Sequence, residues 1–213
     1  MRIFDISQEV FGCAVYPGDP APEKIALMRI ADGAVCNLTA LKMCAHNGTH
    51  VDAPFHFIDG GRTVDQAGLD PFVGYAYVAT HEGSLSAEDA EAILDRAGAA
   101  ALQAGITGCA GRILVRGKAV VTEEAAGVFA KRGILLFGNE SQTVGPEDAP
   151  MAVHLAMLGA GIVLLEGIRL AETKDGIYFL NAAPLNLGGS DGAPCRAWLI
   201  PADDLRALPP SEK

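Results

Sequence analysis

Short apolar runs bounded by glycine or proline recur along the chain and predict the strands of a sheet. They lie at residues 3–7, 75–80, 112–117, 133–138, 161–170 and 195–201. Each run has the length of a strand and is rich in β-branched or aromatic residues. The chain is therefore expected to build much of its core from β-structure.

Three longer stretches between these runs predict helices. Ser86 begins the first, residues 86–98, and Asp89 follows three positions later, as in a variant of the capping box. Thr122 begins the second, residues 122–133, with acidic residues in its first turn. The third, residues 146–161, has proline near its beginning and glycines at its end, which is the asymmetry of a helix.

Strand and helix patterns alternate from about residue 86 to residue 166, which predicts βαβ units and parallel strands. The first 80 residues show strand and turn patterns without a convincing helix. No internal repeat or low-complexity linker interrupts the chain. We therefore predict one mixed α/β domain spanning residues 1–213, β-rich in its N-terminal part.

Composition narrows the class of protein. The formal net charge of −10 argues against a sequence-independent grip on nucleic acid, which requires clustered lysine and arginine. Five scattered cysteines without a CxxC motif predict reduced thiols, mostly small buried residues. The N-terminus lacks the apolar core of a signal peptide, and no window has 18 apolar residues. These features predict a soluble cytoplasmic protein.

The stretch HNGTHVDAPFH, residues 46–56, concentrates the candidate chemistry, because it holds three of the five histidines and one aspartate. Its four potential metal ligands are His46, His50, Asp52 and His56. A helix is a poor expectation for a segment with Asn-Gly, β-branched residues and proline. In an extended chain the four side chains share parity and point to one side.

A straight strand would still hold the backbones of His46 and His50 about 13 Å apart, too far to share one ion. Asn47-Gly48 is a strong turn signal and supplies the bend, and Pro54 restricts the backbone beyond the ligands. We therefore predict a metal site. The alternative is a hydrogen-bonded polar loop without an ion.

Further ligands must come from elsewhere in the chain. His81 lies in a polar turn and is expected to be a solvated surface residue. His154 lies in an apolar helix pattern, and Glu166 ends an apolar strand pattern twelve residues later. Alone, each is expected to be structural, a core histidine or a solvated strand-end carboxylate. The intervening turn could nevertheless bring both to one edge of a sheet, where α/β sites form.

Residues 46–56 resemble the HxGTHxDxPxH signature of the cyclase-like metal-dependent hydrolases, a family of kynurenine formamidase and isatin hydrolase type. VYPGDP at 15–20 looks like the family's aromatic-Pro-Gly-Asp turn. Residues 154–170 resemble its HxxLLxxGxxIxE segment, and residues 183–199 its PLxLxGxDxSPxRA stretch. The resemblance extends from about residue 5 to residue 199.

The resemblance implies a fold and a set of site residues. The implied fold is α/β with a β-barrel-like sheet and flanking helices, usually assembled as a homodimer or homotetramer. The implied cofactor is one or two divalent metal ions, zinc first and manganese as the alternative. With two ions, the carboxylates of Asp52 and Glu166 would bridge them. The implied ligands are His46, His50, Asp52, His154 and Glu166, with His56 as the acid/base.

Two departures from the family pattern bear on the substrate. Tyr16 stands where a formamidase has tryptophan against an aromatic substrate, so it is the candidate substrate-binding residue. Asn139 and Glu140 replace the Asp and Thr of a GIDTxS pattern.

The function expected from these residues is metal-dependent hydrolysis of a C–N amide bond in a small molecule, such as an N-formyl aryl amine. The alternatives are cyclic amide or lactone opening, a cyclase or isomerase reaction through an enolate, and a non-catalytic metal-binding module.

Overall fold

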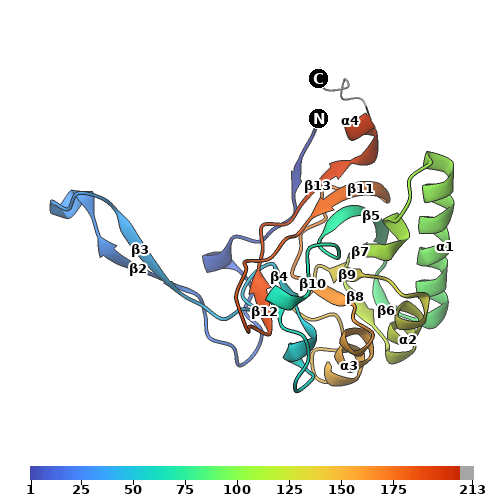
Figure 1. Ribbon diagram of the computed structural model, residues 1–213, viewed down its shortest axis with the longest axis horizontal. Coiled ribbons are helices and arrows are strands. Elements are labelled where there is room, and N and C mark those ends of the chain that lie inside the picture. Colours follow the sequence, from blue (N-terminus) through green and yellow to red (C-terminus); the bar gives the residue numbers. More distant parts are fainter. Residues whose placement is uncertain (207–213) are drawn as a thin grey trace.

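The computed structural model describes residues 1–206, and its centre is a nine-stranded mixed sheet (Figure 1). The strands in chain order are β1 (Phe4–Asp5), β2 (Glu23–Met28), β3 (Leu38–Lys42), β4 (His50–Asp52), β5 (Val73–Thr80), β6 (Gly83–Leu85), β7 (Arg112–Arg116), β8 (Ala119–Val121), β9 (Leu136–Asn139), β10 (Val163–Glu166), β11 (Gly176–Asn181), β12 (Gly192–Pro194) and β13 (Trp198–Pro201).

The helices are α1 (Ala87–Ala104), α2 (Glu123–Arg132), α3 (Met151–Gly159) and α4 (Ala202–Arg206). Short 3-10 turns are η1 (Val10–Gly12), η2 (Ile30–Asp32), η3 (Pro54–His56), η4 (Val64–Gln66) and η5 (Cys109–Gly111). Ser86 and Asp89 form the predicted capping box at the start of α1, and Thr122 caps α2 by accepting from the Ala125 N–H. The first helix continues to Ala104, beyond the predicted residue 98.

The strand order in the large sheet is β1-β13-β11-β5-β7-β9-β10-β4-β12. The central strands β5, β7, β9 and β10 are parallel, as the alternating pattern predicted. Antiparallel strands extend both edges, because β11 pairs with β5 and β4 pairs with β10. The sheet curls like half of a barrel, which confirms the expected α/β class and barrel-like sheet.

Helices α1, α2 and α3 lie together on one side of the parallel strands (Figure 1). Alternate residues of β7 point to opposite sides, so Ile113 and Val115 enter the core beneath the helices while Leu114 enters the second core. Both faces of the central strands are thus buried, as expected for parallel sheet covered on each side. Among the helices of residues 1–206, none has the length and apolarity that a membrane crossing requires.

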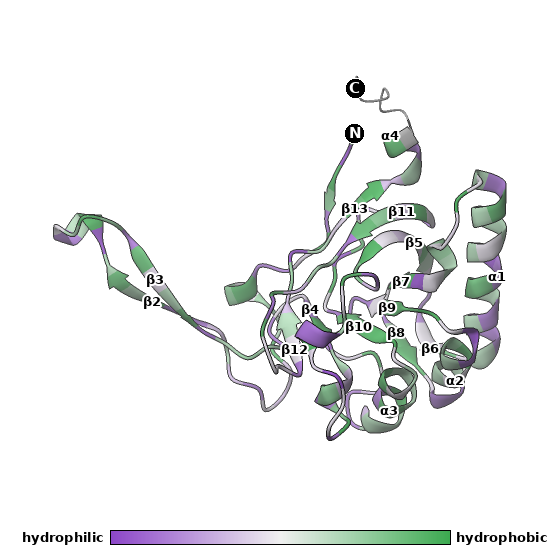
Figure 2. Cartoon of the chain, in the orientation of Figure 1, coloured by the Kyte–Doolittle hydropathy of each residue, from purple (hydrophilic) through white to green (hydrophobic). Residues whose placement is uncertain are grey.

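A hairpin formed by β2 and β3 projects far from the sheet, and we call residues 23–42 the arm (Figure 1). No residue of the arm is buried. Both apolar and polar residues occur along it (Figure 2), and its exposed apolar side chains include Leu27, Val35 and Leu41. An isolated two-stranded hairpin is marginally stable in water, so this segment lacks the support that the rest of the chain has.

The five cysteines are free thiols, in agreement with the expectation from their spacing. Only Cys109 is fully buried, and Cys36 is exposed on the arm. The other three are half-buried, so the expectation that most of the cysteines are buried residues is wrong. His81 lies in the turn between β5 and β6, where its Nε2 is 3.0 Å from the Ser84 carbonyl oxygen.

Candidate active site

The site is built on the pairing of β4 with β10. Glu166 is directly opposite His50 in the antiparallel register, and Leu164 is opposite Asp52. His50 and Asp52 are two positions apart and share one face of β4, whereas Val51 between them enters the core. The three polar side chains therefore meet on one side of the sheet although they come from strands more than a hundred residues apart.

Helix α3 adds His154 to this cluster. Its Nε2 lies 3.3 Å from Glu166 Oε1 and 3.6 Å from Asp52 Oδ2. His50 Nε2 lies 3.4 Å from Glu166 Oε2 and 3.5 Å from Asp52 Oδ1. The structure thus brings together His154 and Glu166, which the sequence could only suggest as neighbours at a sheet edge.

Backbone carbonyls orient both buried imidazoles. His154 Nδ1 is 2.8 Å from the Pro150 carbonyl oxygen, and His50 Nδ1 is 3.0 Å from the Gly48 carbonyl oxygen. A carbonyl only accepts, so each Nδ1 carries a proton, and in the neutral ring the Nε2 lone pair is directed toward the carboxylates, where a cation would bind. Metal-binding histidines are held in this way by their second nitrogen.

The predicted bend between His46 and His50 is present. Gly48 has a φ of 72°, a left-handed conformation that favours glycine. Asn47 is fully buried, accepts from the Cys44 N–H at 2.9 Å and donates to the Pro20 carbonyl at 3.2 Å. His46 Nδ1 consequently reaches Asp52 Oδ1 at 2.9 Å. Pro54 begins η3, and this turn returns the chain so that His56 stacks on His46 with ring centroids 4.0 Å apart.

Two atoms of the cluster have no partner within the described residues. His50 Nε2 and Asp52 Oδ2 are buried and make no hydrogen bond. Leaving a buried polar atom unpaired costs about 1–3 kcal/mol, so such atoms in a folded protein call for an explanation. A divalent cation among imidazole nitrogens and carboxylate oxygens supplies one, and this donor set suits zinc, manganese and related ions.

The potential ligand atoms fall into two overlapping groups. His46, Asp52 and His56 form one, and His50, Asp52 and Glu166 form the other, with the atoms of each group within 4.8 Å of one another. Asp52 belongs to both groups. The arrangement is compatible with one ion or with two ions that share a carboxylate.

Without an ion, the cluster resembles a set of buried ion pairs. Burial opposes ionisation of Asp52, but the hydrogen bond from His46 and the nearby imidazole of His50 outweigh it and hold the pKa of Asp52 well below its usual range. Burial likewise disfavours protonated His50, yet the nearby carboxylates of Asp52 and Glu166 raise its pKa well above the ordinary value. His56 differs, because the neighbouring carboxylates do not outweigh burial, and burial lowers its pKa.

Asp191 is a site residue that the sequence reasoning did not single out. It lies just before β12, and its Oδ2 is 2.8 Å from His46 Nε2 and 3.2 Å from His56 Nδ1. The sequence did contain a feature that could have identified it, because Asp191 is the aspartate of the C-terminal stretch that resembles the family pattern. Nothing in the local sequence relates that aspartate to histidines 145 and 135 positions earlier.

A cavity of about 200 Å³ opens onto the cluster. Tyr16 lines it, and its hydroxyl donates to the Glu147 carbonyl oxygen at 2.8 Å. Burial raises the pKa of this hydroxyl, with nearby acidic residues adding to the effect. The other lining residues are Asp19, His46, His50, His56, Phe57, Gln142, Thr143, Pro150, His154 and Glu166.

Comparisons with known proteins identify the family of this chain. The Cyclase family model, described as "Putative cyclase", matches residues 4–146. A kynurenine formamidase of Salinibacter ruber is 33% identical over 96% of this chain and 100% of its own. The chain belongs to the cyclase family.

Solved structures of similar proteins share the fold. One, described as a potential metal-dependent hydrolase with cyclase activity, is 25% identical with a TM-score of 0.73 and covers 93% of this chain and 96% of its own. Isatin hydrolase A of Labrenzia aggregata, bound to benzyl benzoate, has a TM-score of 0.73 at 20% identity over 94% of this chain and 93% of its own. At that identity, the second likeness concerns the fold alone.

The departure from the cyclase family pattern at residues 139–140 lies outside the cavity. Asn139 is buried and donates to the carbonyl oxygens of Ala119 and Thr143. Glu140 accepts from the backbone N–H groups of Gly117 and Leu170 at 2.7 and 2.9 Å. Both side chains hold neighbouring loops, so any influence on the substrate must be indirect. Tyr16, in contrast, faces the cavity directly.

Proposed function

We propose that this member of the cyclase family is a metal-dependent hydrolase of C–N amide bonds, with an N-formyl aryl amine as the substrate. The observation that carries the proposal is the buried cluster of His50, Asp52, His154 and Glu166, which contains two unpaired atoms and borders a cavity lined by Tyr16 through His50, His154 and Glu166. The kynurenine formamidase name of a relative that aligns along its whole length supports the formamide substrate.

The proposed metal ligands are His46, His50, Asp52, His154 and Glu166, with zinc as the first candidate and manganese as the second. When bound, a divalent cation supplies Lewis acidity, which lowers the pKa of water toward about 7 and polarises a carbonyl oxygen. If two ions bind, Asp52 and Glu166 are the proposed bridging carboxylates, in keeping with the place of Asp52 in both ligand groups.

His56 is the proposed acid/base. It is partly exposed to the cavity, and its lowered pKa keeps the ring neutral near pH 7, able to accept a proton and return it to the leaving nitrogen. Tyr16 is the proposed contact for the aryl group, since its ring borders the same cavity. The stacking of Phe57 on His154 at 4.4 Å adds an apolar wall.

A substrate panel tests the proposal. Metal-loaded protein is incubated with aryl formamides, isatin and simple lactones, and products are measured by mass. Turnover of a formamide with addition of one water is the expected result. Turnover of isatin alone would overturn the formamide assignment, and a product of unchanged mass would indicate isomerisation. Metal binding without any turnover would indicate a non-catalytic module.

The metal should stabilise the fold more strongly as pH rises. The raised pKa of His50 means that its protonated form stabilises the metal-free protein fully below about pH 6.5, and this contribution is lost as pH rises through the raised value. Metal binding requires the neutral imidazole and releases the proton. We expect the increase in Tm caused by saturating zinc to be several degrees larger at about pH 8 than at about pH 6. Differential scanning fluorimetry measures it, and an equal shift at both pH values would contradict the assignment.

We further propose that residues 1–213 form one hydrolase domain, acting in the cytoplasm on a small molecule without nucleic acid or membrane partners.

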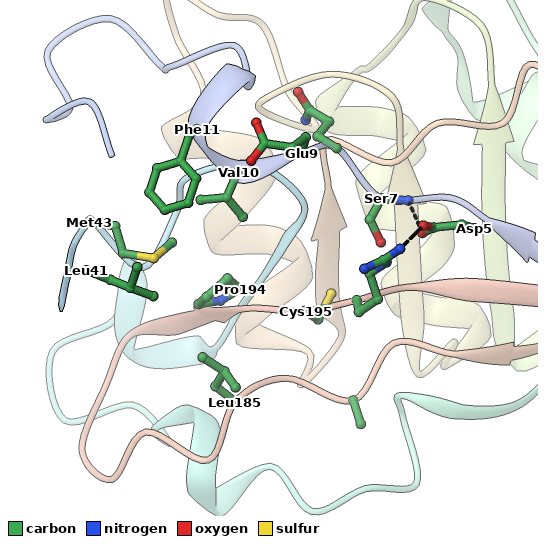
Figure 3. Close-up of a pocket in the computed structure, with 13 residues that line it drawn as sticks. Asp5, Ser7, Glu9, Val10, Phe11, Leu41, Met43, Leu185, Pro194 and Cys195 are labelled. Atoms are coloured by element: carbon green, nitrogen blue, oxygen red, sulfur yellow. Dashed lines mark hydrogen bonds and ion pairs between the residues drawn. The ribbon is translucent and has the colours of Figure 1, made fainter. Parts of the chain in front are cut away.

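A homodimer or homotetramer is the proposed assembly. The arm supports it, because Leu27, Val35 and Leu41 are 58%, 91% and 61% exposed. Leu41 also lines a groove of about 720 Å³ beside the base of the arm, together with Phe11 and Met43 (Figure 3). The apolar surface therefore continues from the arm onto the body of the protein.

Charges placed on the arm should prevent assembly without unfolding the monomer. We expect Leu27→Glu combined with Leu41→Glu to shift the protein to monomers, because both side chains are exposed in the single chain and would be covered in an oligomer. Leu102→Glu is the matched control, since Leu102 is 85% exposed on α1. Light scattering after size-exclusion chromatography measures the mass. An oligomer that survives both arm substitutions would exclude the arm as the contact.

A further inference from the structure

A single carboxylate oxygen contacts two histidines of the site. Asp191 Oδ2 lies 2.8 Å from His46 Nε2 and 3.2 Å from His56 Nδ1. The two imidazole rings are stacked at 4.0 Å with an interplanar angle of 26°, so their edges face the same oxygen. One side chain therefore connects a proposed metal ligand with the proposed acid/base.

Each contact selects the ring nitrogen that remains free. His46 lies between two carboxylates, with Nδ1 2.9 Å from Asp52 Oδ1 and Nε2 facing Asp191. A neutral imidazole has one N–H, and donation of Nε2–H to Asp191 leaves the Nδ1 lone pair directed at the ligand cluster. Donation of Nδ1–H from His56 to the same oxygen leaves its Nε2 free to exchange a proton.

The loop that carries Asp191 is held by contacts that do not involve its carboxylate oxygen Oδ2. The Asp191 carbonyl oxygen accepts from the Ala53 N–H at 2.9 Å, and the Ser190 carbonyl oxygen accepts from the Val64 N–H at 2.9 Å. Asp65 Oδ1 accepts from the Gly189 N–H at 3.0 Å. The loop has its own anchors, so the carboxylate is available for the histidines.

We propose that Asp191 is a positioning residue, which orients His46 through Nε2 for metal binding through Nδ1 and orients His56 with Nε2 toward the reacting groups. The proposal rests on the metal site of the proposed function. Carboxylates that hold a ligand histidine by its second nitrogen fix its tautomer and increase its basicity. Here the same carboxylate also sets the direction of a proton carrier that does not need to bind the ion.

The test measures metal affinity as well as turnover. Apo protein is titrated with zinc in competition with a chromophoric chelator, for the wild type, Asp191→Ala and Asp191→Asn. We expect Asp191→Ala to weaken zinc binding about 10–100-fold, as loss of such a carboxylate does elsewhere. Asp191→Asn keeps an oxygen that accepts a hydrogen bond and should recover part of the affinity. For a substrate that the wild type hydrolyses, kcat at saturating metal should fall in Asp191→Ala with little change in KM.

Asp65→Ala is the matched control, because it removes an anchor of the same loop without touching either histidine. Zinc affinity in Asp191→Ala within about twofold of the wild type, or an equal loss in Asp65→Ala, would overturn the proposal. The comparison of zinc affinities does not depend on which substrate the protein hydrolyses. If the wild type binds zinc but hydrolyses no member of the panel, the proposed substrate class fails while the affinity comparison still decides the role of Asp191.

Discussion

Asp52→Asn is expected to purify without its divalent metal and to lose at least about 10³-fold in kcat/KM, because the Lewis acid contributes several kcal/mol to the reaction. Asp52 Oδ1 is 2.9 Å from His46 and 3.5 Å from His50, and Oδ2 is 3.6 Å from His154. Asparagine has nearly the same shape but lacks the negative charge that compensates a divalent cation. No other side chain of the described site contacts all three histidines.

Elemental analysis and substrate kinetics measure the two effects on the same preparation. Asp175→Asn is a suitable control, since Asp175 pairs with Arg96 and Arg116 and contacts none of the site residues. Circular dichroism confirms that both variants are folded. A metal content equal to that of the wild type in Asp52→Asn would contradict the proposed ligand set.

His56→Asn is expected to lower kcat by about 10²–10⁴-fold while leaving the metal in place, the range typical for loss of a general acid/base. The amide nitrogen of asparagine can take the place of Nδ1 and keep the contact with Asp191, whereas no group replaces Nε2. The substitution therefore removes the proposed proton carrier with little disturbance of its surroundings. Steady-state kinetics and metal content are both measured.

The metal content of this variant separates two roles, because His56 also belongs to one of the potential ligand groups. Loss of metal from His56→Asn would assign His56 as a ligand in place of an acid/base. His81→Asn is the matched control, as His81 lies in the turn after β5 and contacts Ser84. Its kcat and metal content should equal those of the wild type.

The central fold was predictable because its signals are local. Apolar runs at 75–80, 112–117 and 133–138 overlap β5, β7 and β9, and the capping residues Ser86 and Thr122 stand at the starts of the helices between them. The short strands β4 and β12, the last two at one end of the sheet, were not predictable in the same way. Each has three residues, and each is a strand because of its neighbours more than because of its own composition.

The arm illustrates a second limit. Its apolar residues are consistent with strands, but the sequence does not reveal that no other part of residues 1–206 covers them. Hydrophobic periodicity indicates that a segment has an apolar side. It does not indicate whether that side meets the chain's own core or another molecule.

For the site, spacing predicted the bend at Asn47-Gly48 and the shared face of His50 and Asp52, because both follow from backbone geometry over a few residues. The partnership of His154 and Glu166 was only suggested, since it depends on how α3 packs against β10. The contact of Asp191 with His46 depends on the placement of a loop 145 residues away. Such contacts are set by the whole fold, and a single sequence carries no direct signal for them.

The antiparallel register of β4 places His50 opposite Glu166 on one side and opposite Pro194 on the other. A slip of β4 by one residue would turn Val51 toward the ion and His50 and Asp52 into the apolar interior. A bound cation would therefore report the register of β4, because only chains in which β4 has paired correctly with β10 and β12 would retain it. Molecules in which these strands have paired wrongly would then be found without metal, even where the rest of the molecule is folded.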